Sequence, residues 1–416
     1  MELTPSSEPA ELGFVPEGWD VVSLGELFEF RNGVNADKGA YGAGTRFINV
    51  LEIITRAHIA PADIPGRVAL PKSAIERYSV RRGDLVFNRT SETQQEVGLA
   101  AAYVGDEEVV FGGFVIRARP KDGSLDHVFA GYALRSRAVR VQITARGQGA
   151  IRANIGQADL GCVLIPRPPL PEQRAIAGAL GEVDSLIESL KGLIKKKRDL
   201  RGAAAHELLT GRARLLGFDG TWERRRLGDI ATIVKGSGLS KGALSESGSR
   251  RCLLYGELFT TYGRVIREVF SRTDATGGLP SKDGDVLVPG STTTTGLDLA
   301  TASALTLGDV ALGGDINVIR QRSGSYNPLF LANYLTHVAR RAIAEAAQGI
   351  TIIHLYGRDL AGLELRLPPL DEQSAIGMIL SDMDAEIEAL EARLAKTRDL
   401  KQGMAQDLLT GRTRMA

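Results

Sequence analysis

The residues of this chain that could do chemistry are basic and polar side chains that stand beside short apolar runs. Arg31, Lys38 and Arg46 surround a glycine-rich stretch, and Arg89 follows the apolar run DLVF. Arg and Lys bind phosphate or guanine, Asn and Gln suit adenine, and Ser and Thr reach either a phosphate or a base edge. Any one of these residues taken alone is more simply explained as solvated charge, because nearby acidic residues nearly balance the bases. Taken as a set, they predict a face that binds DNA.

The predicted DNA-binding set has members in both halves of the chain. Arg117 and Arg119 alternate along one apolar run, so a strand there would turn both to one side. The first half contributes Arg31, Lys38, Arg46, Asn49, Arg89, Thr90, Ser91, Arg117, Arg119, Arg152 and Asn154. The second half contributes Lys235, Lys241, Ser291, Thr292, Thr293, Thr294, Arg320, Arg322 and His354. The second half has STTTTG at residues 291–296 where the first has RTSETQQ, so the two halves are not expected to make matching contacts.

No catalytic signature accompanies this set. The sequence lacks the GxxxxGK[ST] phosphate loop, the HExxH and CxxC metal motifs and the GxSxG nucleophile motif. The glycine-rich KGSGLSKG at residues 235–242 lacks the phosphate-loop spacing and predicts a turn. Two cysteines and five histidines are scattered along the chain, so no metal site is expected. The sequence therefore predicts a binding protein without an active site of its own.

The bulk composition limits what the chain can bind and where it resides. The chain has 416 residues and a formal net charge of +1, so DNA binding must come from local basic loops or with the help of a partner. No run of about 18 apolar residues is present, so no membrane span is expected. The first residues lack the basic start and apolar run of a secretory signal, so no such signal is expected. The two cysteines lie far apart in the sequence, which suits a reducing cytoplasm.

One sequence segment occurs twice. Residues 168–180 read PPLPEQRAIAGAL, and residues 368–380 read PPLDEQSAIGMIL. The match extends without a gap over 168–214 and 368–414, with about half of the positions identical, and it ends in TGRAR and TGRTR. Pro171 and Asp371 suit a first helical turn, and Gly211 and Gly411 suit the left-handed residue that ends a helix. Each copy therefore predicts one long helix.

Apolar residues in both predicted helices step alternately by four and three, which is an a/d heptad seam. The seam residues are Ile176, Leu180, Val183, Ile187, Leu190 and Ile194 in the first copy and Ile376, Leu380, Met383, Ile387, Leu390 and Leu394 in the second. One such helix cannot bury its stripe by itself, so we expect the two copies to pack against each other. An antiparallel pair is preferred. The alternative is that each helix packs only on its own globular domain.

The blocks that precede the two helices predict a mixed α/β (α+β) fold. Short β-branched runs such as DLVFNR, VVFGGFVIRAR, CVLIPR and DVLVPG predict strands, and residues 129–143 and 330–347 have helical spacing. The whole chain is then a pseudo-twofold tandem repeat with two globular domains separated by a long two-helix antiparallel coiled coil. The expected boundaries are an N-terminal tail (1–16), a first globular domain (17–167), a first helix (168–214), a second globular domain (215–367) and a second helix (368–414).

The repeated motifs match a known family. PPLxEQxxI, a heptad helix and LLTGRxR, repeated after a variable block that opens with W…LG, resemble the specificity subunit of type I restriction–modification systems. The resemblance covers nearly the whole chain. It implies that residues 17–167 and 215–367 are target-recognition domains, each reading one half of a split, asymmetric sequence in double-stranded DNA. It also implies that the two helices fix the spacer between the half-sites and dock two methyltransferase subunits.

The same resemblance implies that the chemistry lies elsewhere. The methyl donor would bind in the partner methyltransferase subunits, and restriction/translocase subunits would join the complex to cleave DNA. This chain would then have neither catalysis nor a cofactor. Two other classes stay open: a self-contained DNA-modifying enzyme, such as a nuclease with a cryptic site, and a coiled-coil scaffold whose end domains bind protein or glycan. Cleavage or methylation by the isolated chain would favour the first, and failure to bind DNA in the assembled complex would favour the second.

Overall fold

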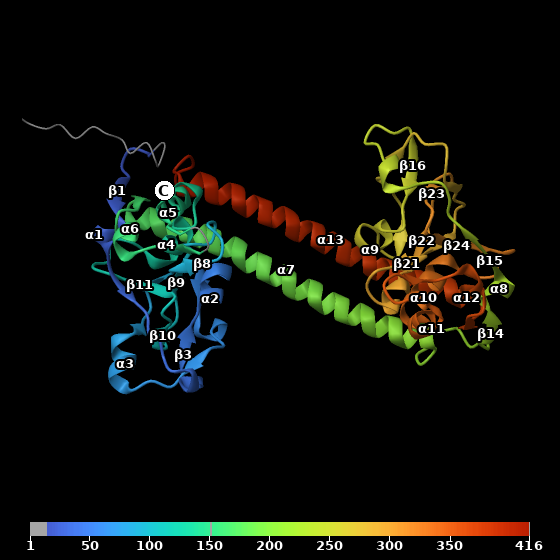
Figure 1. Cartoon of the computed structure of the whole chain (residues 1–416), viewed down its shortest axis with the longest axis horizontal. Coiled ribbons are helices and arrows are strands. Elements are labelled where there is room, and N and C mark those ends of the chain that lie inside the picture. The colour runs from blue at the N-terminus through green and yellow to red at the C-terminus, as the bar shows by residue number, and fades with distance from the viewer. Residues whose placement is uncertain (1–14, 150–151, 416) are drawn as a thin grey trace, which may run out of the picture. The chain divides into compact units, whose positions relative to one another are not determined.

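The computed structural model describes residues 15–149 and 152–415, and the chain divides into two compact units. The first unit comprises residues 1–189 and 394–416, and the second comprises residues 190–393. Each unit therefore contains one globular block, the start of one long helix and the end of the other. The long helices are α7 (Leu170–Thr210) and α13 (Leu370–Leu409) (Figure 1).

The first unit is built on a five-stranded sheet in the order β2-β11-β7-β9-β4. The pairs are antiparallel except for β4 with β9. The strands are β2 (Phe28–Asn32), β11 (Val115–Pro120), β7 (Leu85–Asn88), β9 (Ala100–Tyr103) and β4 (His58–Ile59). A second sheet has the order β5 (Arg67–Val68), β3 (Tyr41–Ile48), β10 (Val109–Phe111) and β6 (Ser79–Val80). Two short ribbons pair β1 (Asp20–Ser23) with β13 (Leu164–Arg167) and β8 (Thr90–Ser91) with β12 (Ala153–Asn154).

Alternation along these strands divides the core of the first unit into two layers. Leu85 and Phe87 of β7 pack with Phe129 of α4, and the same cluster includes Leu180 of α7. Val86 between them faces the other way, toward α2 and the second sheet. The helices are α1 (Leu24–Leu27), α2 (Val50–Thr55), α3 (Lys72–Arg77), α4 (His127–Ala133), α5 (Arg137–Arg146) and α6 (Gln157–Gly161), with 3-10 turns at Lys38–Ala40 and Pro61–Asp63.

The second unit repeats this topology strand for strand. Its five-stranded sheet has the order β15 (Ala231–Lys235), β24 (Ile316–Gln321), β20 (Asp285–Pro289), β22 (Ser303–Leu305) and β17 (Val265–Ile266). Its second sheet has the order β18 (Arg272–Thr273), β16 (Arg250–Leu253), β23 (Ala311–Leu312) and β19 (Leu279–Pro280). The ribbons pair β14 (Glu223–Arg226) with β26 (Glu364–Leu367) and β21 (Ser291–Thr292) with β25 (Ile353–His354).

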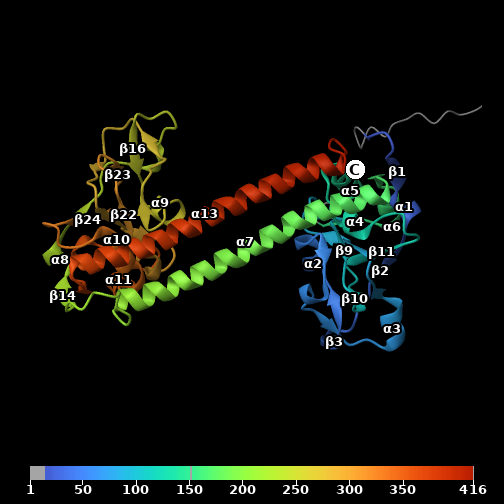
Figure 2. The same ribbon diagram turned by 180° about the vertical axis from the view of Figure 1, so that it is seen from behind.

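The helices of the second unit follow those of the first, except that none of the described residues forms a counterpart of α3. They are α8 (Leu227–Ile230), α9 (Glu257–Thr260), α10 (Pro328–His337), α11 (Arg340–Ala346) and α12 (Gly357–Ala361), with 3-10 turns at Lys241–Ala243 and Gly296–Leu299. Phe330 of α10 packs with Val286 and Val288 of β20 in one buried cluster. The view from behind shows α10 and α11 beside the strands of this unit (Figure 2). The expected mixed fold with a tandem repeat is confirmed.

Two details differ from the sequence-based expectation. The run VVFGGFVIRAR forms two strands in different sheets, because the chain turns at Gly112-Gly113. A Cβ on Gly33 would lie 2.1 Å from the carbonyl oxygen of Gly112, so this close backbone approach requires glycine. The expected helices 129–143 and 330–347 are each broken into two. In the first break, Arg135 donates to the carbonyls of Arg56 at 2.7 Å and Ala100 at 2.8 Å, so the interruption cross-links three segments.

Within each unit the two long helices pack antiparallel. In the first unit Leu180, near the start of α7, shares a buried cluster with Leu408 and Leu409 at the end of α13. In the second unit Leu380 of α13 packs with Leu208 and Leu209 of α7. All twelve predicted seam residues are buried or partly buried, with Val183, Met383 and Leu390 partly so. Each helix start also packs on its own domain, so the long helices contact both each other and the globular blocks.

The helix ends follow the predicted capping. Gly211 and Gly411 have φ of +71° and +68°, so both adopt the left-handed conformation that glycine accepts without strain. Pro171 and Asp371 lie in the first turns, as expected.

Candidate nucleic-acid interface

Several of the predicted DNA-binding residues lie together at one end of the strands of the five-stranded sheet in the first unit. The register places Asn32, at the end of β2, opposite Ile116, and Asn88, at the end of β7, opposite Val115. The C-terminal ends of β2 and β7 and the start of β11 therefore lie at the same end of the sheet. Arg89 and Thr90 follow β7 directly, and the β8–β12 ribbon continues from there. We call this end of the sheet the first polar edge.

The side chains of the first polar edge surround a hollow of about 420 Å³. Thr90 Oγ1 donates to Asn154 Oδ1 at 2.6 Å, which orients the Asn154 amide. The Arg89 backbone N–H donates to the Phe114 carbonyl at 2.8 Å, so its loop is tied to the turn before β11. The residues that line the hollow are Asn32, Arg89, Gln148, Asn154, Ile155, Gly156, Gln157 and Asp159. Amide and guanidinium groups on a rigid strand end suit hydrogen bonding to base edges.

The corresponding edge of the second unit, the second polar edge, has the same backbone and different side chains. Lys235 at the end of β15 forms an ion pair with Asp315 at 3.0 Å, and the Ser291 hydroxyl also donates to Asp315. His354 lies opposite Ser291 in the β21–β25 ribbon. Its ring lies 6.1 Å from that of Tyr356, nearly parallel to it. This edge therefore presents an aromatic pair and a neutralised carboxylate where the first presents amides.

Arg117, Arg119 and Arg320 are held by buried partners inside their own units. Arg119 makes two hydrogen bonds to Asp84, at 3.0 and 2.7 Å, and Arg320 makes the equivalent pair with Asp285 at 2.9 and 2.7 Å. Both carboxylates are buried and raise the pKa of the arginine that they bind. Arg117 is 3% exposed, donates to the Ser79 carbonyl at 2.6 Å, and has its pKa lowered by burial. As expected from strand alternation, Arg117 and Arg119 point to one side, where both reach Ser79. Their contacts hold the sheets together, so they are weaker candidates for DNA contact than the edge residues.

The other members of the predicted set are spread over both units. Arg31 donates to the carbonyl of Arg77 in α3, and Arg46 of the second sheet binds Glu107. Ser91 and Thr292 are buried in the ribbons, where Ser91 donates to Glu96. The exposed members are Lys38, Asn49, Arg152, Lys241, Thr293, Thr294 and Arg322. Arg152 and Thr293 lie next to the two polar edges, whereas Arg322 lies at the opposite end of its strand, where it donates to Thr232.

The repeated motifs have a structural role that the sequence did not reveal. Glu172 of the first PEQ segment receives two hydrogen bonds from Arg414 of the final TGRTR segment, at 2.7 and 2.8 Å. Arg214 binds Glu372 in the same way in the second unit, at 2.6 and 2.7 Å. The motif that begins one helix is therefore tied to the motif that ends the other. The spacing of 242 residues between Glu172 and Arg414 left no local signal of this pair.

The glutamine of each repeated motif connects the long helix to its globular domain. Gln173 accepts from the backbone N–H of Asp126 at 2.7 Å and donates to its own Pro168 carbonyl at 2.7 Å. Gln373 accepts from Asn327 at 2.9 Å and donates to Pro368 at 2.8 Å. Asp126 and Asn327 are the N-caps of α4 and α10. The glutamine thus fixes the angle between the long helix and the helix that covers the sheet.

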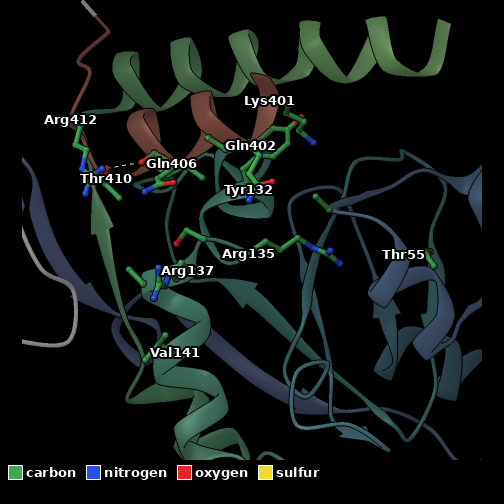
Figure 3. Close-up of a pocket in the computed structure, with 15 residues that line it drawn as sticks. Thr55, Tyr132, Arg135, Arg137, Val141, Lys401, Gln402, Gln406, Thr410 and Arg412 are labelled. Atoms are coloured by element: carbon green, nitrogen blue, oxygen red, sulfur yellow. Dashed lines mark hydrogen bonds between the residues drawn. The ribbon is translucent and has the colours of Figure 1, made fainter. Parts of the chain in front are cut away.

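A groove of about 810 Å³ runs between α5 and the end of α13 in the first unit (Figure 3). Tyr132 and Lys401 line it, and both contact Asp184: the tyrosine hydroxyl donates at 2.7 Å and the lysine lies at 2.6 Å. Lys401 also lies 5.3 Å from the centre of the Tyr132 ring. Arg135, with its pKa lowered to about 10 by burial, is held by backbone carbonyls. The charged groups of this groove therefore mainly hold the helix end to the domain.

Among the described residues, no group of three or more His, Cys, Asp or Glu side chains could hold a metal ion. Within those same ranges, no helix is long and apolar enough to cross a bilayer.

Comparison with known proteins identifies the family. Residues 16–196 and 219–397 match the model of the type I restriction modification DNA specificity domain. The putative type I restriction enzyme MjaX specificity subunit of Methanocaldococcus jannaschii is 24% identical, over 97% of this chain and 96% of the relative. The StySPI specificity subunit of Salmonella potsdam is 25% identical, over 95% and 89%.

A solved structure shares the fold. The type I restriction–modification S subunit from M. genitalium has a TM-score of 0.60 at 18% identity, covering 94% of this chain and 96% of that one. The two matches to one domain model account for most of the chain and coincide with the internal repeat. Because specificity subunits are the non-catalytic members of these complexes, the absence of a catalytic motif is consistent with the match. The chain belongs to the type I restriction–modification specificity subunits, whose task is recognition of the DNA target.

Proposed function

We propose that each unit reads one half of an asymmetric, bipartite DNA sequence through its polar edge, and that the long helices set the spacer between the halves. The observation that carries the proposal is that the two edges share a backbone and differ in side chains. Thr90 and Asn154 in the first unit correspond to Ser291 and His354 in the second, at equal places in matching ribbons. A common backbone would place both edges alike against DNA, and different side chains would select different bases.

Type I specificity subunits work with DNA and with partner subunits of a restriction–modification complex. We infer that two methyltransferase subunits dock on equivalent faces of the long helices and carry the methyl donor, and that restriction/translocase subunits join them. A repeated exposed leucine supports this inference. Leu200 of α7 is 50% exposed, and Leu400, its equivalent on α13, is 59% exposed. Each follows an Arg-Asp pair within the repeat, RDLRG and RDLKQ. Equivalent apolar positions in both units suit two copies of one partner.

A substitution series tests this docking. Leu200→Glu and Leu400→Glu should each leave one methyltransferase subunit bound, and the double variant should bind none, because a charge desolvated in an apolar contact is costly. Native mass spectrometry of the co-expressed complex gives the stoichiometry. Leu216→Glu is the matched control, since Leu216 is fully exposed outside the helix and should leave two copies bound. Two copies retained by the double variant would refute the leucine contacts.

An assay with and without the partner tests the function itself. The purified chain should neither methylate nor cleave DNA, and with its methyltransferase it should protect one bipartite sequence. Cleavage by the isolated chain with a divalent metal would instead favour a nuclease. Absence of DNA binding by the assembled complex would favour a scaffold for protein or glycan. DNA as the target also supports a cytoplasmic location, which fractionation would check.

A further inference from the structure

An exposed aromatic ring stands at the first polar edge. Phe114 is 60% exposed and lies in the turn between β10 and β11. Isolated exposed rings are common on protein surfaces, so exposure by itself carries no meaning. The turn that holds this ring is, however, fixed on three sides. The Phe114 carbonyl accepts from Arg89 at 2.8 Å, Val115 N–H donates to Gly112 at 2.9 Å, and the Asn35 side chain fills the space where a Cβ of Gly113 would lie.

The neighbours of Phe114 have the chemistry of base recognition. Arg89 follows β7, Asn32 ends β2 and Asn154 lies in the ribbon, all at the edge where β11 begins. In the major groove adenine presents one acceptor and one donor, which suit an amide, and thymine presents a methyl group, which suits an apolar side chain. Amides at the strand ends, next to a turn that carries an exposed ring, therefore match the two halves of an A·T pair.

The second unit lacks this arrangement at the matching position. Its turn reads Gly313-Gly314-Asp315 where the first reads Gly112-Gly113-Phe114. Asp315 is bound by Lys235 and Ser291, so a polar, internally satisfied group replaces the ring. At this turn the two units differ in one side chain on an equivalent backbone, in addition to the other differences between the two polar edges.

We propose that Phe114 contacts the 5-methyl group of a thymine in the half-site read by the first unit, beside an adenine that the amides of the first polar edge recognise. The proposal rests on the proposed DNA-reading function and adds a base identity to it. The second unit, with Asp315 in place of the ring, makes no such methyl contact. Recognition of one methyl group by burial corresponds to roughly a fourfold change in affinity.

A deoxyuridine scan tests the proposal with the intact complex of the chain and its methyltransferase. Each thymine of the target is replaced by deoxyuridine, which removes only the methyl group, and the dissociation constant is measured by fluorescence anisotropy. The wild-type complex should bind roughly fourfold more weakly when one particular thymine of the first half-site is replaced. Phe114→Ala should abolish that difference, and Phe114→Leu, which keeps an apolar contact, should retain most of it.

Two controls separate this inference from general effects. Phe270→Ala removes another exposed ring, 64% exposed and stacked on Tyr262, and should leave the thymine preference intact. Deoxyuridine in the second half-site should affect wild type and Phe114→Ala equally. The inference is overturned if no thymine of the first half-site is sensitive, or if Phe114→Ala keeps the preference, while binding to the bipartite target still supports the function. Loss of all sequence-specific binding by the wild-type complex would contradict the function itself.

Discussion

The two units contain equivalent ion pairs with a buried carboxylate, yet they surround that carboxylate differently. Glu172 binds Arg414 and also accepts from Trp19 Nε1 at 3.0 Å and from the Met415 N–H at 3.2 Å. Glu372 binds Arg214, whereas the equivalent Trp222 Nε1 has no hydrogen-bond partner among the described residues. One carboxylate is held by several donors and the other depends mainly on one arginine.

A second pair of sites shows the same kind of divergence. Asp184 pairs with Lys401 and Tyr132 in the first unit, and Asp384 pairs with Arg201 in the second. Arg201 is 7% exposed and also donates to Asn333 and His337. The carboxylate keeps its place on the helix and its cation comes from the other helix in both units. The paired long helices therefore keep a carboxylate and its cation at equivalent positions in both units, while the residues around this pair differ between the units.

The largest effect is expected for the loss of Arg214. Arg214→Ala leaves the Glu372 side chain, which is fully buried, without its cation, and should destabilise the second unit by about 3 kcal/mol. Arg414→Ala should cost less, because Trp19 and Met415 still donate to Glu172. Hydrogen exchange, followed separately for each unit, measures the loss of stability in both variants. Arg212→Ala, on the exposed surface beside the pair, is the control. Equal losses in both units would show that the extra donors to Glu172 do not matter.

The polar edges should respond separately. Arg89→Ala should weaken binding of the target by about 1–3 kcal/mol if the guanidinium contacts a base, with relaxed preference confined to the first half-site. Competition binding against single-base variants of each half-site measures both the affinity for the target and the base preference in each half-site. Arg322→Ala, at the far end of β24, should leave both half-site preferences unchanged. Relaxed preference in the second half-site would contradict the assignment of one edge to one half.

Exchanging the two cations tests the second comparison. Arg201→Lys should destabilise the second unit by about 1–2 kcal/mol, because a lysine cannot bind Asp384 through two nitrogens and still reach Asn333. Lys401→Arg should change the first unit by less than about 0.5 kcal/mol, since Lys401 is partly exposed beside Tyr132. Thermal unfolding followed by calorimetry compares the two. A larger loss for Lys401→Arg would reverse the ranking.

A smaller effect is expected on acidification. Burial, with the nearby Arg201, Arg264 and Arg340, lowers the pKa of His337 to about 4. In the unfolded chain His337 therefore binds a proton near pH 6.5, whereas in the folded chain it does so only at lower pH. The free energy of unfolding consequently falls as the pH drops from 6.5 toward 4. The loss at pH 5 should be at most about 1 kcal/mol, because His337 is exposed to solvent, which screens the neighbouring charges. His337→Ser, which introduces the residue of the equivalent position Ser136, should lessen this pH dependence in urea unfolding measured at pH 7 and pH 5. An unchanged pH dependence would argue that His337 stays accessible to protons.

The long helices and their caps could be predicted from the sequence because the heptad periodicity and the positions of Gly211 and Gly411 are local signals. The tandem fold followed from the same repeat. The breaks at Arg135 and Ala339 were not predicted, since helical spacing continues across them and the competing contacts come from distant segments.

The site was predicted only partly, for a related reason. Arg89, Thr90 and Asn154 come together at the first polar edge, whereas Arg119 and Arg320 look the same in sequence and bind buried carboxylates. A basic residue in or after a strand does not reveal whether an aspartate from another segment will bind it. Phe114 was not predicted as a site residue because a single phenylalanine in an apolar run predicts core. It is exposed because the chain turns at Gly112-Gly113.

The proposed function requires that the two long helices hold two different DNA-reading units at a set distance. Genome-wide methylation mapping tests it in a host that expresses the chain with its methyltransferase, beside a variant with one heptad inserted after Ser189 and one after Arg393. Seven residues lengthen a helix by about 10 Å, or about three base pairs of DNA. We expect the wild type to direct methylation of one asymmetric bipartite sequence, and the variant to keep the same two half-sites with a longer spacer. An unchanged spacer in a folded variant, or two identical half-sites, would contradict the proposed function.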